Sequence, residues 1–179
     1  MIPLMTCSFV MWTLILDRVH FFSRLQRKDL ELQALFGILE KDELPESVRG
    51  VRANLVRHLM ANRTYNSTVD KGIVDQCAMA MVPNFDRYLA AIAVLAAVSP
   101  LFGLLGTVTG MITTFDVITL FGTGNAKAMA GGISEALVTT QSGLVVSIPG
   151  FFMSVLLYKQ SAQAKARLKE AVSILKRSL

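Results

Sequence analysis

Two long segments of the chain carry no charged residue, and they dominate its hydropathy pattern. The first extends from Tyr88 to Phe115 and the second from Ala136 to Tyr158. At about 1.5 Å of rise per residue, a helix of either length exceeds the roughly 30 Å hydrocarbon core of a bilayer. The pattern therefore predicts two membrane-spanning helices.

A third apolar run occupies residues 1–16 and is slightly shorter than a usual span. No basic segment precedes it and no small-residue cleavage site follows it, which argues against a cleaved signal peptide. We therefore interpret it as a short first spanning helix. It is clipped, begins at the membrane surface, or continues through Asp17 and Arg18 into the interface, where Trp12 and Phe21 suit the boundary.

Outside these runs, apolar residues recur at helical spacing. They do so in DLELQALFGILEKDEL, in SVRGVRANLVRHLMA and again after Tyr158, which is typical of amphipathic helices. Breaks are expected near Pro45 and at NRTYNST. The predicted fold is an all-α membrane protein with three transmembrane helices and long helices that extend into the cytoplasm. Its predicted segments are a first transmembrane helix at 1–16, a cytoplasmic helical region at 17–87, a second transmembrane helix at 88–121, a link at 122–135, a third transmembrane helix at 136–158 and a C-terminal helix at 159–179.

Composition and charge support this assignment. The chain is 53% hydrophobic and 17% charged, with a mean hydropathy of +0.49. Most of the 18 basic residues lie in residues 17–87 or in the C-terminal tail, whereas the link holds only Lys127. The positive-inside rule then places the region 17–87 and the C-terminus in the cytoplasm. Because topology explains the net charge of +5, we expect a lipid bilayer around the chain and no nucleic-acid partner.

The sequence does not predict catalytic chemistry. Cys7 and Cys77 form no CxxC and have no His-rich cluster beside them, so no metal site is expected. No nucleophile, base and metal constellation indicates an enzyme, and no organic cofactor is expected.

Each of the two long runs carries a face of small and hydroxyl-bearing residues. In the first run, steps of three or four residues relate Gly103, Thr107, Gly110 and Thr114. In the last run the corresponding residues are Thr140, Gly143 and Ser147. These faces either pack on each other or line a lumen. Pro100 and Pro149 are expected to kink their helices, which frees carbonyl groups.

Glu135 stands where the last run begins. A carboxylate there either stabilises the start of a helix or takes part in ion entry or subunit pairing. No acid lies deep in any predicted span. Either this chain does not conduct protons, or a partner supplies the titratable carboxylate.

The segment SPLFGLLGTVTGMITTF, followed by GGISEALVTTQSGLVVSIPGFF, resembles the paired signature of the MotA/TolQ/ExbB proton-channel family. The similarity covers about residues 85–158 and is closest to the ExbB-type members. The flanks agree in order, with a first span that ends in LDRVHFF, a cytoplasmic helical domain and then two spans.

This resemblance implies a cyclic homo-oligomer, commonly a pentamer, around a central pore in the bacterial inner membrane. The N-terminus is then periplasmic, as is the link at 122–135. A single-span partner of the ExbD or TolR type would lie inside the pore and carry an essential aspartate. Thr107 and Thr140 match the pore-facing threonines of the family, and Glu135 matches its acid at the start of the last helix.

In function, the resemblance implies that protons are the coupling ion. The proton-motive force would energise a TonB-like protein for outer-membrane uptake of iron-siderophores or vitamins. The short first run resembles compact ExbB forms that accompany a second type of TonB system. A TolQ-like role in envelope integrity and division remains an alternative, and so does a non-conducting membrane scaffold that uses the glycine faces only for assembly.

Overall fold

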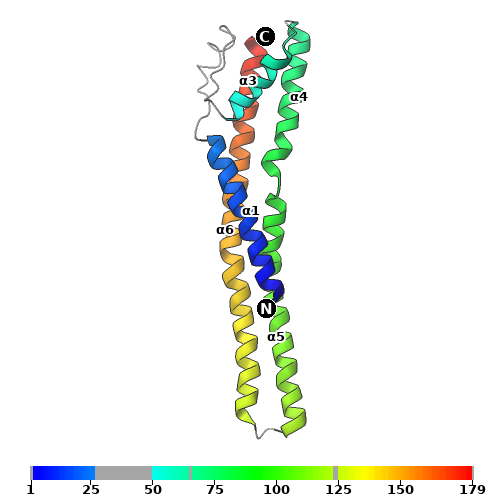
Figure 1. Cartoon of the computed structure of the whole chain (residues 1–179), viewed down its shortest axis with the longest axis vertical. Coiled ribbons are helices and arrows are strands. Elements are labelled where there is room, and N and C mark those ends of the chain that lie inside the picture. The colour runs from blue at the N-terminus through cyan, green and yellow to red at the C-terminus, as the bar shows by residue number, and fades with distance from the viewer. Residues whose placement is uncertain (1, 27–49, 65, 123–124, 179) are drawn as a thin grey trace. The chain divides into compact units, whose positions relative to one another are not determined.

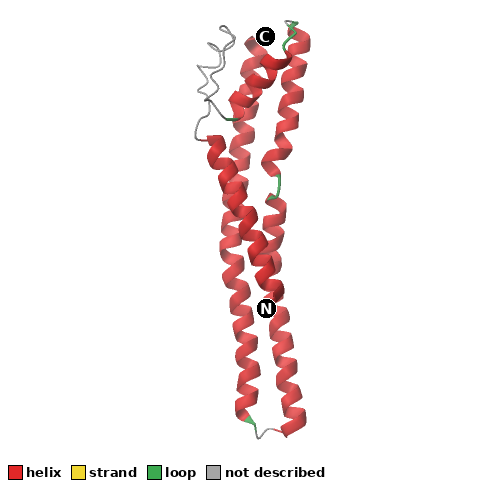
Figure 2. Cartoon of the chain, in the orientation of Figure 1, coloured by secondary structure: helices red, strands yellow, loops and turns green. Residues whose placement is uncertain are grey.

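Every element that the structure describes is a helix (Figures 1 and 2). This computed structural model describes residues 2–26, 50–64, 66–122 and 125–178. The predicted amphipathic helix in DLELQALFGILEKDEL therefore lies outside the described residues. The helices are α1 (Ile2–Gln26), α3 (Val51–Asn62), α4 (Ser67–Asp86), α5 (Leu89–Phe121) and α6 (Ala126–Ser178).

Three described stretches are long and apolar enough to cross a membrane. They lie within Ile2–Leu25, Ser67–Phe121 and Ala126–Ser178. The prediction of an all-helical protein with three candidate membrane spans is therefore confirmed for the described residues. Where each span begins and ends along its helix stays a prediction.

The chain folds as two compact units. The first, here called the span unit, contains Met1–Leu16 and Tyr88–Val155. The second, here called the stalk unit, contains Asp17–Arg87 and Leu156–Leu179. Helices α1 and α6 contribute residues to both units.

In the span unit, a short link joins α5 to α6, and the two helices run antiparallel side by side (Figure 1). Their facing surfaces bury Ala96 and Ser99 from α5 and Ser147 from α6. Helix α1 joins them through Met11, which is fully buried; a Cβ built on Gly150 would lie 2.5 Å from its sulfur. Cys7 is also buried, with its sulfur 3.6 Å from Ser99 Oγ.

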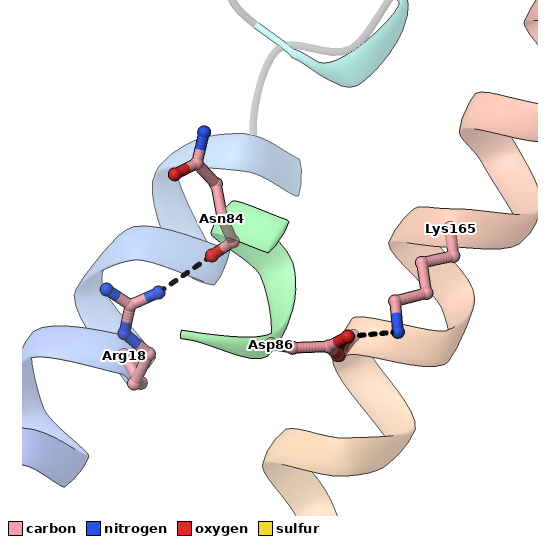
Figure 3. A network of polar contacts seen from close by, with 5 residues as sticks. Arg18, Asn84, Asp86 and Lys165 are labelled. Atoms are coloured by element: carbon pink, nitrogen blue, oxygen red, sulfur yellow. Dashed lines mark hydrogen bonds and ion pairs between the residues drawn. The ribbon is translucent and has the colours of Figure 1, made fainter. Parts of the chain in front are cut away.

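In the stalk unit, helix α3 packs its apolar face inward, as its spacing predicts. Val51, Leu55 and Leu59 are buried there, and Leu168 and Leu175 of α6 are buried in the same unit. The C-terminus of α4 contacts two other helices (Figure 3). Arg18 of α1 donates to the carbonyl of Asn84 at 3.1 Å. The ammonium nitrogen of Lys165 on α6 lies 2.6 Å from Oδ2 of Asp86.

Helix α4 ends at Asp86, and α5 begins three residues later. Tyr88 caps the start of α5 with φ 65° and ψ −5°, the left-handed region that a residue with a Cβ rarely adopts. This break separates the predicted cytoplasmic region from the predicted second span. It coincides with the boundary between the stalk unit and the span unit.

Candidate functional site: the facing surfaces of α5 and α6

Helices α5 and α6 meet along small residues, which we call the seam. A Cβ built on Gly103 would lie 3.1 Å from both Thr139 O and Thr140 Cα. A Cβ on Gly143 would lie 2.9 Å from Ser99 O and 3.1 Å from Gly103 Cα. The two backbones therefore approach so closely that a Cβ at either position would press against backbone atoms of the other helix, as in small-residue packing of membrane helices.

The GxxxG of α5 extends the same contact toward the link. A Cβ on Gly106 would lie 2.6 Å from the Thr139 side chain, and a Cβ on Gly110 would lie 2.9 Å from Ala136 Cβ. Further along, a Cβ on Gly132 would collide with the Thr114 hydroxyl. Gly106 and Gly110 therefore have a partner surface on α6 of the same chain.

Of the seven predicted lumen-lining residues, five are buried between α5 and α6: Gly103, Gly110, Thr114, Gly143 and Ser147. These five residues pack between the two helices, which is the first of the two interpretations of the faces; a role in lining a lumen stays a prediction. Their small side chains allow the two helices to approach closely, and the hydroxyls among them donate hydrogen bonds to backbone carbonyls. Thr114 Oγ1, for example, donates to Gly110 O at 3.0 Å.

Thr107 and Thr140 differ from these five because both are half-buried. Thr107 follows Gly103 by four positions, and Thr140 follows Ala136 by four positions. At about 100° per residue, four residues make one full turn plus roughly 40°, so each threonine is rotated by that angle from its seam residue. In antiparallel helices such turns bring both residues to the same side, and we call this pair the threonine edge.

The two hydroxyls of the threonine edge differ in how firmly they are hydrogen-bonded. Thr107 Oγ1 donates to Leu104 O of its own helix at 2.7 Å. Thr140 Oγ1 has only long contacts, at 3.5 Å, to Gly103 O and Ala136 O. A hydroxyl held this loosely can exchange its partner for a water molecule.

Glu135 does not share this edge. It precedes Thr140 by five residues, which corresponds to roughly 140° around α6. Its side chain is exposed, and none of the residues that the structure describes forms a hydrogen bond or ion pair with its carboxylate. Thr109 and Thr113 of α5 are also exposed and were missed by the sequence analysis, although their four-residue spacing marks a common face.

Acidic side chains are absent from the middle of the α5–α6 pair. Within residues 88–158 the acids are Asp116 and Glu135, and both lie toward the link, whereas Glu170 of α6 belongs to the stalk unit. Pro100 lies within α5 and Pro149 within α6. No group of three metal-binding side chains occurs among the described residues. Cys7 and Cys77 are free thiols.

Comparisons with known proteins agree with the motifs. The sequence model of the MotA/TolQ/ExbB proton channel family matches residues 47–170. The chain is 30% identical over 156 residues to the putative biopolymer transport protein ExbB-like 3 of Synechocystis sp., which covers 82% of this chain and 74% of that protein. It is 28% identical over 188 residues to the biopolymer transport protein ExbB of Salmonella typhimurium, covering 97% of this chain and 77% of that protein. The ExbB-type resemblance drawn from the two motifs is thereby confirmed.

Proposed function

Because the chain belongs to the MotA/TolQ/ExbB proton channel family, we propose that it is the ring-forming subunit of an ExbB-type channel in the bacterial inner membrane. Several copies, commonly five in the family, would surround a pore that holds a single-span partner of the ExbD type. The N-terminus would lie in the periplasm and the C-terminus in the cytoplasm. The protein is a multi-pass membrane protein, and its family supports a proton-channel role.

The threonine edge is the observation that carries this proposal. Thr107 and Thr140 are the hydroxyl residues that flank the glycine seam on one side while remaining partly accessible. The seam holds α5 and α6 at close distance through Gly103 and Gly143. Such a pair offers a narrow, wettable wall beside which a partner helix can move without interlocking bulky side chains.

The missing carboxylate supports the need for a partner. Asp116 and Glu135, the acids within residues 88–158, both lie toward the link, so this chain alone provides no carboxylate at mid-membrane. An ExbD-like helix with an aspartate would complete the path. A proton that crosses the membrane releases about 2.3 kcal/mol per 100 mV, and this energy would act on a TonB-like protein for uptake across the outer membrane.

Glu135 would then act where protons enter or where subunits pair. Its exposed carboxylate suits either role, and it lies on a different face of α6 from the threonine edge. The substitution Glu135→Gln should be assayed for both proton flux and ring assembly, because only the first role predicts a loss of flux from intact rings.

Proton flux into liposomes under an imposed potential tests the proposal. The chain would be reconstituted with and without its ExbD-like partner, and with Thr107→Val or Thr140→Val, which preserve side-chain shape. We expect flux only with the partner, and loss of flux in each variant and in a partner whose aspartate is changed to asparagine. Thr113→Val is the matched control. Like Thr107, Thr113 bonds a carbonyl of its own helix, Thr109 O at 3.1 Å, but it is exposed and lies outside the threonine edge.

The tight seam also favours a second candidate, a non-conducting scaffold in which the glycines serve assembly alone. That function predicts intact oligomers without flux in any combination. Full flux in Thr107→Val and Thr140→Val would likewise remove the threonine edge from the mechanism. A TolQ-like role predicts the same flux but a different downstream protein. Complementation assays would distinguish the two roles, because a TolQ-like protein should restore envelope integrity and an ExbB-like protein should restore siderophore uptake.

A further inference from the structure

The stalk unit contains a hollow of about 450 Å³ that the proposed channel function does not use. This volume lies within the range of sites that bind small molecules. Its wall is formed by α1, α3 and the last turns of α4 and includes Arg87, which follows α4.

The polar lining of the hollow is cationic. Arg18 and Arg87 supply the positive charge, the imidazole of His58 and the amides of Asn54 and Asn84 add polar groups, and none of the lining residues is an acid. Asp17, which pairs with Arg18 at 3.1 Å, is not among them. The hollow therefore offers hydrogen-bond donors and positive charge, the combination that recognises a phosphate or another anion.

Arg18 is fixed in place before any ligand arrives. Its side chain is 7% exposed and donates to Asn84 O, and its guanidinium lies 5.0 Å from the Phe21 ring centroid. Figure 3 shows this arginine reaching from α1 to the end of α4. Holding one cation rigid reduces the entropy lost on binding.

The rest of the wall is apolar, and the sequence places the hollow at the level of lipid headgroups. Phe21, Leu25 and Phe85 supply large apolar side chains. Arg18 follows the first charge-free run by two residues, and Arg87 immediately precedes the run that begins at Tyr88. Both arginines thus stand at ends of predicted spans, where basic residues meet anionic lipids.

We propose that this hollow binds the phosphate of an anionic phospholipid headgroup, with Arg87 and Arg18 on the phosphate and the phenyl rings against the glycerol and upper acyl chains. A soluble phosphate shares the anion chemistry but would leave the apolar wall unused.

Native mass spectrometry of the delipidated full chain in detergent tests this, with phosphatidylglycerol and phosphatidylcholine titrated separately. We expect a tightly bound phosphatidylglycerol and weaker phosphatidylcholine. Arg87→Gln should weaken phosphatidylglycerol binding about tenfold through loss of a charge-assisted hydrogen bond, and Arg87→Lys should weaken it less. Arg24→Gln is the matched control, since Arg24 is exposed, near the end of α1 and outside the hollow.

Each other outcome overturns the proposal. Equal binding of the two lipids would exclude recognition of the anionic headgroup. Equal losses in Arg87→Gln and Arg24→Gln would indicate diffuse surface attraction. A site for soluble anions would be indicated if inorganic phosphate, at the same concentration as phosphatidylglycerol, displaced the lipid and if its binding depended on Arg87. Circular dichroism of each variant separates these results from misfolding.

Discussion

Ser147 of α6 donates a hydrogen bond to the carbonyl of Ala96 on α5, with 2.8 Å between the two oxygens. Ala96 lies four residues before Pro100, so its carbonyl faces the one residue type that has no N–H to offer. Ser147 and Ala96 are both buried. The serine therefore supplies across the seam the donor that the proline removes from within the helix.

This relationship predicts that Ser147→Ala destabilises the chain, because a buried carbonyl loses its partner. The expected cost is about 1–3 kcal/mol. In a Pro100→Ala background the backbone N–H returns, and the same substitution should cost clearly less. A double-mutant cycle of unfolding free energies in mixed micelles measures the coupling. Ser142→Ala is the control, since its hydroxyl bonds Val138 O of its own helix at 2.8 Å; additive costs of Ser147→Ala and Pro100→Ala would contradict the assignment.

The seam predicts a contrast between two glycines of α6. Gly143→Ala should destabilise the chain by about 1–3 kcal/mol, because its Cβ would stand 2.9 Å from Ser99 O, a backbone atom that cannot rotate away. Gly131→Ala should be neutral or slightly stabilising, since nothing lies within 4 Å and alanine favours a helix. Thermal unfolding in detergent compares the two. Equal effects would mean that the seam is looser than described.

The sequence predicts much of this arrangement but not its registers. The spacing of apolar residues alone identifies the face of α3 that points inward, since Val51, Leu55 and Leu59 are buried. The small residues of the two long runs indicated that α5 and α6 have a special surface. Which glycine meets which carbonyl depends on how far one helix slides along the other, and periodicity carries no such information.

The contact between Ser147 and Ala96 illustrates this limit. The sequence places Ser147 on a face that either packs on the other helix or lines a lumen, and it does not indicate which carbonyl the hydroxyl bonds; the structure shows the bond to Ala96 O. The break before Tyr88 was also missed. Pro83 lies inside α4, and no glycine marks the left-handed residue. The break is supported from outside by contacts to Asn84 and Asp86, which come from α1 and α6 and are distant in sequence.

Asp86 predicts a pH dependence. The hydrogen bond from Lys165 holds the pKa of the Asp86 carboxyl below its usual value, burial opposes this, and a hydrogen bond from Ser161 lowers the pKa further. A carboxyl whose pKa is lowered on folding stabilises the fold above its unfolded pKa, about 3.9, and this contribution is lost as the pH falls through the folded pKa.

The expected size of that contribution is small, because the Asp86 side chain is 46% exposed and solvent screens the pair. Asp86→Asn should lower the unfolding free energy at pH 7 by at most about 1 kcal/mol. The difference from the unsubstituted chain should shrink below about pH 4. Chemical unfolding across this range measures it. In a Lys165→Met background the difference should already be reduced at pH 7, and a difference that grew as the pH fell would contradict the sign.

Arg18 predicts a larger effect, because its charge is buried and its bonds hold two helices. Its guanidinium donates to Asn84 O in the last turn of α4, where the carbonyls have no further helical turn to bond. Arg18→Gln should cost about 1–3 kcal/mol in unfolding free energy, whereas Arg24→Gln, at an exposed position of the same helix, should change it by less than about 0.5 kcal/mol. Arg18→Lys should not restore the full stability, because an ammonium cannot reach Asp17 and Asn84 with the geometry of a planar guanidinium. Amide hydrogen exchange of the last turn of α4 should rise in Arg18→Gln alone. Unchanged exchange there would show that the arginine stabilises the fold only by packing against Phe21.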